Sequence, residues 1–203
     1  PLNFSGRLDY LISYPHGCVE QITSSVFPQL YLDDLFDLSN ERAQKIQENI
    51  ALALQKLTAF QLPGGGFSYW PGLTQPDDWG TNYLGHFLIE AEKSGYVLPI
   101  GMKAQWLTFQ QKSAKAWRKN NTNSYLTQAY RLYTLALAGV PDLASMNRLR
   151  QSAGLDVGSR FRLAAAYALV GQKTAAEELM ANLTYDYQND QNNFFTFGSE
   201  TRN

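Results

Sequence analysis

The residues of this chain best suited to chemistry lie in one short stretch, "YPHGCVEQ", which spans residues 14–21. It holds the chain's only cysteine, Cys18, and a carboxamide three positions later at Gln21. Side chains three apart on a helical turn can meet. A thiolate held against a carboxamide carbon can attack it and expel ammonia. The product is an internal thioester, which is an acyl group activated for transfer.

The sequence around the thiol predicts that a helix begins there. Pro15 biases Tyr14 away from helical conformation, whereas residues 18–27 contain no helix breaker. Gly17 removes a side chain directly beside the thiol. The positive end of a helix dipole favours a thiolate and also accommodates Glu20 in the first turn.

Two other interpretations of the cysteine remain open. A lone cysteine is commonly a small buried hydrophobic residue. The cysteine nucleophile of a hydrolase needs a histidine base, and the chain offers only His16 and His86. His16 is two residues from the thiol and would have to fold back. His86 falls within a helical pattern, where we expect it to pack, with Glu90 one turn on as its partner.

A glycine-rich aromatic stretch, "LPGGGFSYWPG" (residues 62–72), interrupts the helical pattern. Its three consecutive glycines free the backbone for a tight loop beside Phe67, Tyr69 and Trp70. The aromatic side chains could plug the end of a helical layer, or the loop could wall a reactive site.

The rest of the chain reads as helix after helix. "NERAQKIQENIALALQKLTAF" (residues 40–60) carries an apolar stripe at three- and four-residue steps, after a cap at Ser39 or Asn40. Similar segments follow to about residue 183, with almost no strand-like alternation. Helix stops are predicted at Gly95, Gly139 and Gly171. The pattern predicts an all-α domain of repeated helical hairpins.

Composition excludes several classes of protein. The 203 residues have a net charge of −1 and no basic run, so nothing favours nucleic acid as a partner. No apolar stretch is long enough to cross a membrane. One cysteine and two histidines leave no disulfide framework and no expected metal site or cofactor. The chain opens abruptly at "PLNFSG", as an excised segment would, so the missing signal peptide says little about the compartment.

"GCVEQ" resembles the thioester motif of the alpha-macroglobulin family, which includes the thioester complement components. "YPHGC" is similar to the bacterial members, and "FPQLYLDDL" resembles the family's continuation of the same helix. "GGGFSYWPG" with "WGTNYLGHFLIEAEKSGY" is similar to the next landmark, and "FTFGSETRN" to a further one. The resemblance covers residues 1–203 as a single thioester domain, cut before its C-terminal end and belonging to a much larger chain.

The resemblance implies an α/α toroid of stacked helical hairpins, similar to the terpenoid cyclases. It implies that Cys18 supplies the sulfur and Gln21 the acyl carbon, with Gly17 and Glu20 as motif flanks. Val19 stands where many animal members have glycine. The residues expected to cover the site are Tyr14, Phe67, Tyr69 and Trp70. Because the neighbouring domain that helps to close the site is missing from this segment, we expect a free Cys18 thiol close to the surface.

The function implied is that of a broad-spectrum protease inhibitor in the periplasm or at the cell surface. In the family, a protease cleaves a bait region in another domain, and the exposed thioester acylates the attacker once, so this is not an ordinary enzyme. Some complement-type members pass the acyl group through a histidine in a segment that corresponds here to residues 110–130. That segment contains no histidine, so attack by amines, chiefly lysine, is expected to dominate.

Two alternatives from other classes remain. An α/α-toroid enzyme such as a glycosidase or cyclase could use Asp77 and Asp78 as paired carboxylates, although "PDDWG" also reads as a helix cap. A helical interaction module without a functional thioester is the other alternative.

Overall fold

The computed structural model describes residue 8, residues 10–118 and residues 123–181 of the chain. These residues form helices joined by loops, and the single isolated bridge among them pairs Gln61 with Phe67. The predicted all-α class is confirmed for this part of the chain. The landmark "FTFGSETRN" lies outside the described residues. The elements are α2 (Val19–Val26), η1 (Pro28–Tyr31), α3 (Leu32–Leu35), α4 (Asn40–Leu57), η2 (Thr58–Phe60), α5 (Asp78–Lys93), α6 (Met102–Ala116), α7 (Asn123–Leu137), α8 (Leu143–Arg150), α9 (Val157–Leu169) and α10 (Lys173–Met180).

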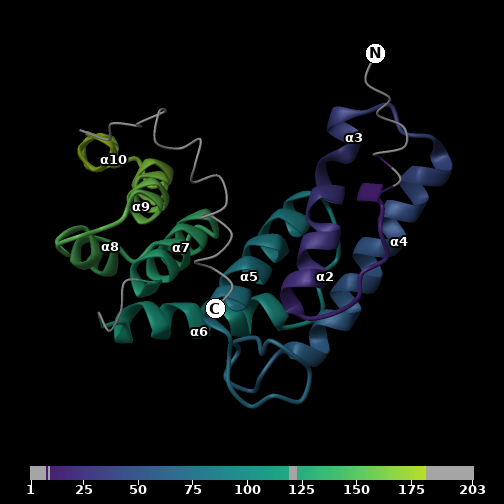
Figure 1. Ribbon diagram of the computed structural model, residues 1–203, viewed down its shortest axis with the longest axis horizontal. Helices are drawn as coiled ribbons and strands as arrows, with labels where there is room; N and C mark the ends of the chain where they lie inside the picture. The colour runs from purple at the N-terminus through teal and green to yellow at the C-terminus, as the bar shows by residue number, and fades with distance from the viewer. Residues whose placement is uncertain (1–7, 9, 119–122, 182–203) are drawn as a thin grey trace, which may run out of the picture. The chain divides into compact units, whose positions relative to one another are not determined.

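The chain divides into two compact units, residues 1–116 and residues 117–203. In the first unit, α2 lies between α4 and α5 and packs on both (Figure 1). In the second unit, α9 packs on α7 and on α10. The prediction of a single domain over residues 1–203 stays a prediction. In the described part of the chain, no helix combines the length and hydropathy needed to cross a bilayer.

Short-range signals in the sequence set the helix ends. Ser39 Oγ accepts a hydrogen bond from the Arg42 backbone N–H at 3.3 Å and caps α4, as predicted. Asp77 Oδ1 accepts from the Gly80 backbone N–H at 2.6 Å and caps α5. The predicted stops are also confirmed, since they adopt the left-handed backbone conformation that ends helices, with positive φ at Gly95, Gly139 and Gly171.

The core of the first unit depends on close contact between α5 and α6. Trp106 of α6 is fully buried, and its Nε1 donates to the Thr81 carbonyl at 2.9 Å. The indole lies over Gly85, where a Cβ would come within 1.9 Å of the ring. Glycine at this position therefore admits the largest buried side chain of the described core, and it fixes how α5 meets α6.

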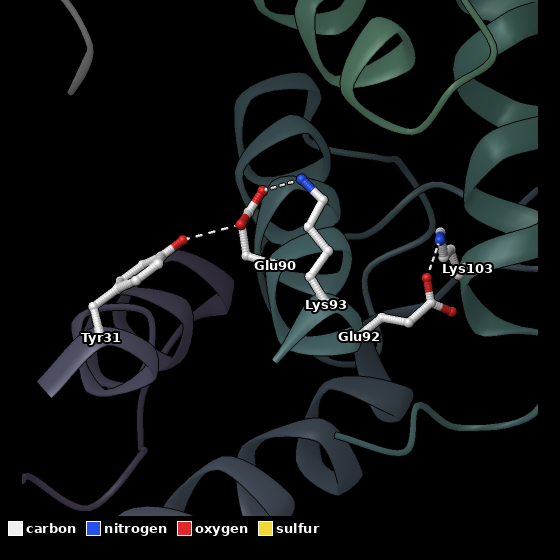
Figure 2. A network of polar contacts seen from close by, with 5 residues as sticks. All are labelled: Tyr31, Glu90, Glu92, Lys93 and Lys103. Carbon is white, nitrogen blue, oxygen red and sulfur yellow. Dashed lines mark hydrogen bonds and ion pairs between the residues drawn. The ribbon is translucent and has the colours of Figure 1, made fainter. Parts of the chain in front are cut away.

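A surface network holds the C-terminal end of α5 (Figure 2). Tyr31 of η1 donates to one Glu90 oxygen at 3.2 Å, and Lys93 pairs with the other at 2.9 Å. Lys103 of α6 pairs with Glu92. Most of these side chains are partly exposed, so each pair contributes at most about 1 kcal/mol. The opposite end of α5 lies beside the candidate site.

Candidate functional site

Helix α2 begins at the thiol, as the sequence predicted. Cys18 is its N-cap residue and Gln21 occupies the third helical position. The Cys18 backbone N–H donates to Gln21 Oε1 at 3.0 Å, and the Gln21 backbone N–H is directed to the Cys18 side chain. This is the reciprocal geometry of a capping box, with cysteine and glutamine as its members. The structure therefore brings the thiol-bearing residue and the carboxamide together.

Gly17 leaves the space that the carboxamide occupies. Its φ of 102° lies in the left-handed region, which other residues rarely adopt. A Cβ built there would lie 2.1 Å from Gln21 Oε1 and 2.9 Å from Gln21 Cδ. Any side chain at this position would push Gln21 away from Cys18.

Burial differs between the two partners, and one expectation is wrong. Cys18 is only 2% exposed, not close to the surface as expected, whereas Gln21 is exposed. The reason lies in α5, whose first turn packs tightly against the residue after the thiol. A Cβ at Gly80 would lie 2.6 Å from Val19 Cγ1, and Val19 itself is fully buried. The thiol is therefore shielded from solvent by residues of the first unit itself.

The aromatic loop reaches the motif through Tyr69. The Val19 backbone N–H donates to the Tyr69 carbonyl at 3.2 Å. The Tyr69 hydroxyl donates to Glu20 Oε2 at 3.4 Å. The Cys18 side chain, followed by desolvation and the nearby charge of Glu20, raises the pKa of Tyr69 to about 12. The phenol is therefore protonated, and able to donate, at neutral pH.

The other loop aromatics have different positions. Phe67 is fully buried, and its backbone N–H donates to Thr81 Oγ1 of α5 at 2.9 Å, so it anchors the loop in the core. Trp70 is 46% exposed and meets the Tyr69 ring edge-on, with centroids 6.1 Å apart. The shielding role predicted for both residues stays a prediction.

The glycines of this loop explain how it can lie so close to α6. A Cβ at Gly65, where φ is 91°, would lie 2.2 Å from the Gln105 carbonyl oxygen. A Cβ at Gly66 would come within 2.8 Å of the Phe109 ring. The loop thus packs against a neighbouring helix, and it also hydrogen-bonds the backbone of the residue that follows the thiol. Its role as the wall of a reactive site stays a prediction.

Tyr14 is held by a residue that sequence reasoning missed. Lys56 Nζ donates to the Tyr14 hydroxyl and to the Pro15 carbonyl, both at 2.9 Å, and lies 4.1 Å from the Tyr14 ring centroid. Tyr14 is 52% exposed. Lys56 comes near the end of α4 and is indistinguishable in sequence from other surface lysines, so no local signal could have found it.

The remaining candidates fall into structural positions. The His86 ring meets Phe27 edge-on at 5.1 Å, which agrees with the expectation that it packs. Glu90, its expected partner, bonds Tyr31 and Lys93. Asp77, one half of the proposed carboxylate pair, is engaged as the cap of α5. The described residues contain no group of three or more His, Cys, Asp or Glu that could hold a metal ion.

Comparisons with known proteins bear on this geometry. The sequence matches the family model of the A-macroglobulin TED domain over residues 3–131. It is 30% identical over 103 residues to alpha-2-macroglobulin of Escherichia coli strain K12, a match that spans 49% of this chain and 6% of that protein.

Two solved structures share the fold. Salmonella alpha-2-macroglobulin reacted with methylamine has a TM-score of 0.74 at 24% identity, over 89% of this chain and 13% of that chain. Trypsin-activated alpha-2-macroglobulin from Escherichia coli has a TM-score of 0.68 at 23% identity, over 83% of this chain and 13% of that chain. The predicted α/α-toroid class of fold is confirmed, and the chain spans only a small part of each relative.

Proposed function

Since this chain belongs to the alpha-macroglobulin TED domain family, we propose that it is the thioester-bearing part of a bacterial alpha-2-macroglobulin-like protease inhibitor. Cys18 provides the sulfur of an internal thioester and Gln21 its acyl carbon, flanked by Gly17 and Glu20. The matched relatives are many times longer than this chain. Protease inhibition is therefore proposed for the full-length protein that carries this segment.

The reciprocal contact between Cys18 and Gln21 carries this proposal. It holds the carboxamide over the residue that bears the thiol, at a hydrogen-bond distance of 3.0 Å. In bond formation the sulfur attacks Gln21 Cδ, the C–N bond breaks, and the amide nitrogen leaves as ammonia with the proton of the thiol. The near-complete burial of Cys18 supports a stored thioester, because such a bond survives only where water is kept out.

Trapping of a protease takes place at the same carbon atom, Cδ of Gln21. An amine attacks the thioester carbonyl, the C–S bond breaks, an amide forms and the thiol is released. The reaction happens once per molecule, so the protein acts as a covalent trap and not as an enzyme in the ordinary sense. Two of the matched structures are of relatives reacted with an amine and activated by a protease, which supports lysine side chains of proteases as the acceptors.

Amines are the acceptors that this chain favours. The relay segment, residues 110–130, contains no histidine, and His86 packs against Phe27. Without an intermediate acyl-imidazole, a hydroxyl has no activated route to the acyl group.

The proposed location is the periplasm or the cell surface, where a protease trap meets foreign proteases. The proposed partners are those proteases and the other domains of the same chain.

Intact-mass spectrometry of the full-length protein tests the bond. Wild type should be lighter than its calculated mass by one ammonia, should take up one methylamine at Gln21, and should then expose one free thiol. Cys18→Ala should retain its calculated mass and take up none. Equal methylamine incorporation in the two proteins would refute the proposal.

Competition between methylamine and glycerol for the thioester tests which class of acceptor is preferred. Predominant glycerol esters would show that a relay exists.

A further inference from the structure

Thr81, near the start of α5, holds the aromatic loop by its side chain and the core by its backbone. Its Oγ1 accepts a hydrogen bond from the Phe67 backbone N–H at 2.9 Å and donates to the Phe67 carbonyl at 3.1 Å. One hydroxyl thus pairs with both backbone groups of one residue, as a neighbouring strand would. The Thr81 carbonyl accepts from Trp106 Nε1 at 2.9 Å, and Thr81 itself is fully buried. The loop is therefore fixed to the part of α5 that α6 holds in place.

The same stretch of the loop contacts the thiol motif two residues further on. The Tyr69 carbonyl accepts from the Val19 backbone N–H at 3.2 Å, and Val19 directly follows the thiol-bearing Cys18. The intervening loop residue, Ser68, is buried, and its backbone N–H donates to the Phe60 carbonyl at 2.9 Å. The path from α5 to the motif thus runs through three consecutive loop residues, each of which is held by at least one hydrogen bond.

Val19 is held from a second direction by the residue before Thr81. A Cβ at Gly80 would lie 2.6 Å from Val19 Cγ1, so α5 packs directly on the Val19 side chain at this point. Consecutive residues of α5 therefore hold Val19 in two ways, its side chain directly and its backbone through the loop. Val19 is fully buried, and Cys18 beside it is nearly so. Two contacts that begin at the start of α5 thus meet at the residue next to the thiol.

We propose that Thr81 is a positioning residue for the thioester: its hydroxyl fixes the loop against the first turn of α2 and so keeps water from the acyl group. This inference rests on the proposed function. In this role Thr81 acts through Phe67 and Tyr69. Without the hydroxyl, the buried Phe67 N–H would lose its partner, and a buried donor without a partner is costly. The loop would then open more often, and water would reach the bond between Gln21 Cδ and Cys18 Sγ.

The reaction that Thr81 suppresses is hydrolysis of the thioester. A water oxygen bonds to Gln21 Cδ, the C–S bond breaks, and its electron pair goes to the sulfur, which takes up one proton of the water. The products are a carboxylic acid at position 21 and a free thiol at Cys18. Together they are heavier than the intact thioester by one water, so intact mass reports the fraction of bond that remains.

The test uses Thr81→Val in the full-length protein, because valine keeps the shape of the side chain and removes the hydroxyl. Thr81→Ser is the conservative variant, which retains the hydroxyl and loses only the methyl group. The matched control is Gln110→Met, which removes a buried hydrogen bond between α6 and α5, from Nε2 to Asn82 Oδ1 at 2.6 Å, that is not made to the loop. Each protein is incubated in amine-free buffer and followed by intact mass, and its unfolding midpoint is measured in denaturant.

We expect the thioester of Thr81→Val to hydrolyse about tenfold faster than that of wild type, as the loss of one buried hydrogen bond implies. Thr81→Ser should retain the wild-type rate. Gln110→Met should also retain it, even where its unfolding midpoint falls as far as that of Thr81→Val, because the contact it loses does not lie between α5 and the loop. A role of Thr81 in general stability alone would make the hydrolysis rate follow the midpoint in all four proteins.

A second measurement does not depend on the bond. In a Gln21→Ala background, which leaves the Cys18 thiol free, native labelling by a maleimide should accelerate about tenfold with Thr81→Val and stay unchanged with Thr81→Ser. Val19→Pro interrupts the path at its other end, because proline lacks the N–H that donates to Tyr69 and is well tolerated at the first position of a helix. It should accelerate hydrolysis as Thr81→Val does, and it takes the place of that variant if Thr81→Val does not fold.

The outcomes are distinct. If wild type shows neither the ammonia loss nor methylamine uptake, the proposed function fails, and the labelling experiment alone decides whether Thr81 shields the thiol. Equal hydrolysis and labelling rates in wild type and a folded Thr81→Val would overturn the role of Thr81 while the proposed function stands. Equal acceleration in Gln110→Met would overturn that role as well, because loss of packing elsewhere in the first unit would then be enough to expose the bond.

Discussion

Replacing Gly17 by alanine should separate the chemistry of the motif from its contribution to stability. Two costs follow from the structure. A φ of 102° places an L-residue in the left-handed region, at about 1–2 kcal/mol. The new Cβ also stands 2.1 Å from Gln21 Oε1, so the carboxamide must move and its bond to the Cys18 N–H is lost, at about 1 kcal/mol. The expected destabilisation of Gly17→Ala is about 2–3 kcal/mol.

Gly72→Ala is the matched control. Gly72 has a similar φ of 86°, and a Cβ there meets nothing within 4 Å. It should pay the backbone cost of about 1–2 kcal/mol and no more. Chemical denaturation of the two variants and wild type would give these differences. Intact mass and methylamine uptake would then report the bond, which Gly72→Ala should form and Gly17→Ala should not.

The comparison can refute the reasoning in two ways. A Gly17→Ala protein that carries a full complement of thioester would mean that the carboxamide does not need the space above Gly17. Equal loss of the bond in both alanine variants would mean that backbone strain alone, and not displacement of Gln21, decides bond formation.

Further predictions concern the core, the loop and the thiol. Gly85→Ala should lower the free energy of unfolding by about 1–3 kcal/mol in a denaturant titration, because the new Cβ would overlap the Trp106 ring. An unchanged midpoint would contradict this packing. Tyr69 has a folded-state pKa of about 12 against an ordinary 10, so its stabilising effect is complete below pH 10 and is lost as pH rises through 12. Wild type should therefore lose stability more steeply than Tyr69→Phe between these values, and parallel curves would count against the contact. In a Gln21→Ala background, which cannot form the thioester and leaves the Cys18 thiol free, native labelling by a maleimide should be slow. Labelling should accelerate when Lys56→Met is added, because this change frees the Tyr14–Pro15 turn; fast labelling of the Gln21→Ala background itself would show that the site is open.

Much of the local architecture could be read from the sequence because its causes are local. Ser39 caps α4 by accepting a hydrogen bond from a backbone N–H in the first turn of that helix. Gly95, in the left-handed conformation, follows directly on the last turn of α5. The contact between Cys18 and Gln21 also has a local cause, because a spacing of three residues on one helical turn brings the two residues together. Such features are set by residue type and short spacing.

The surroundings of the thiol were decided by tertiary structure. Tyr69 lies 49 residues from Glu20, and Lys56 lies 41 residues from Pro15, and neither pairing has a signature in the sequence. The contacts of the glycine-rich segment with α6 and with Val19 of α2 likewise have no signature in the sequence. Burial of Cys18 reversed the expectation from sequence, because exposure depends on every element that converges on an atom. Here the first turn of α5 approaches Val19 across Gly80, while the aromatic loop contacts the same turn of α2. A motif of a few residues can specify which bond is formed, but solvent exclusion is the sum of long-range contacts and depends on the packed fold.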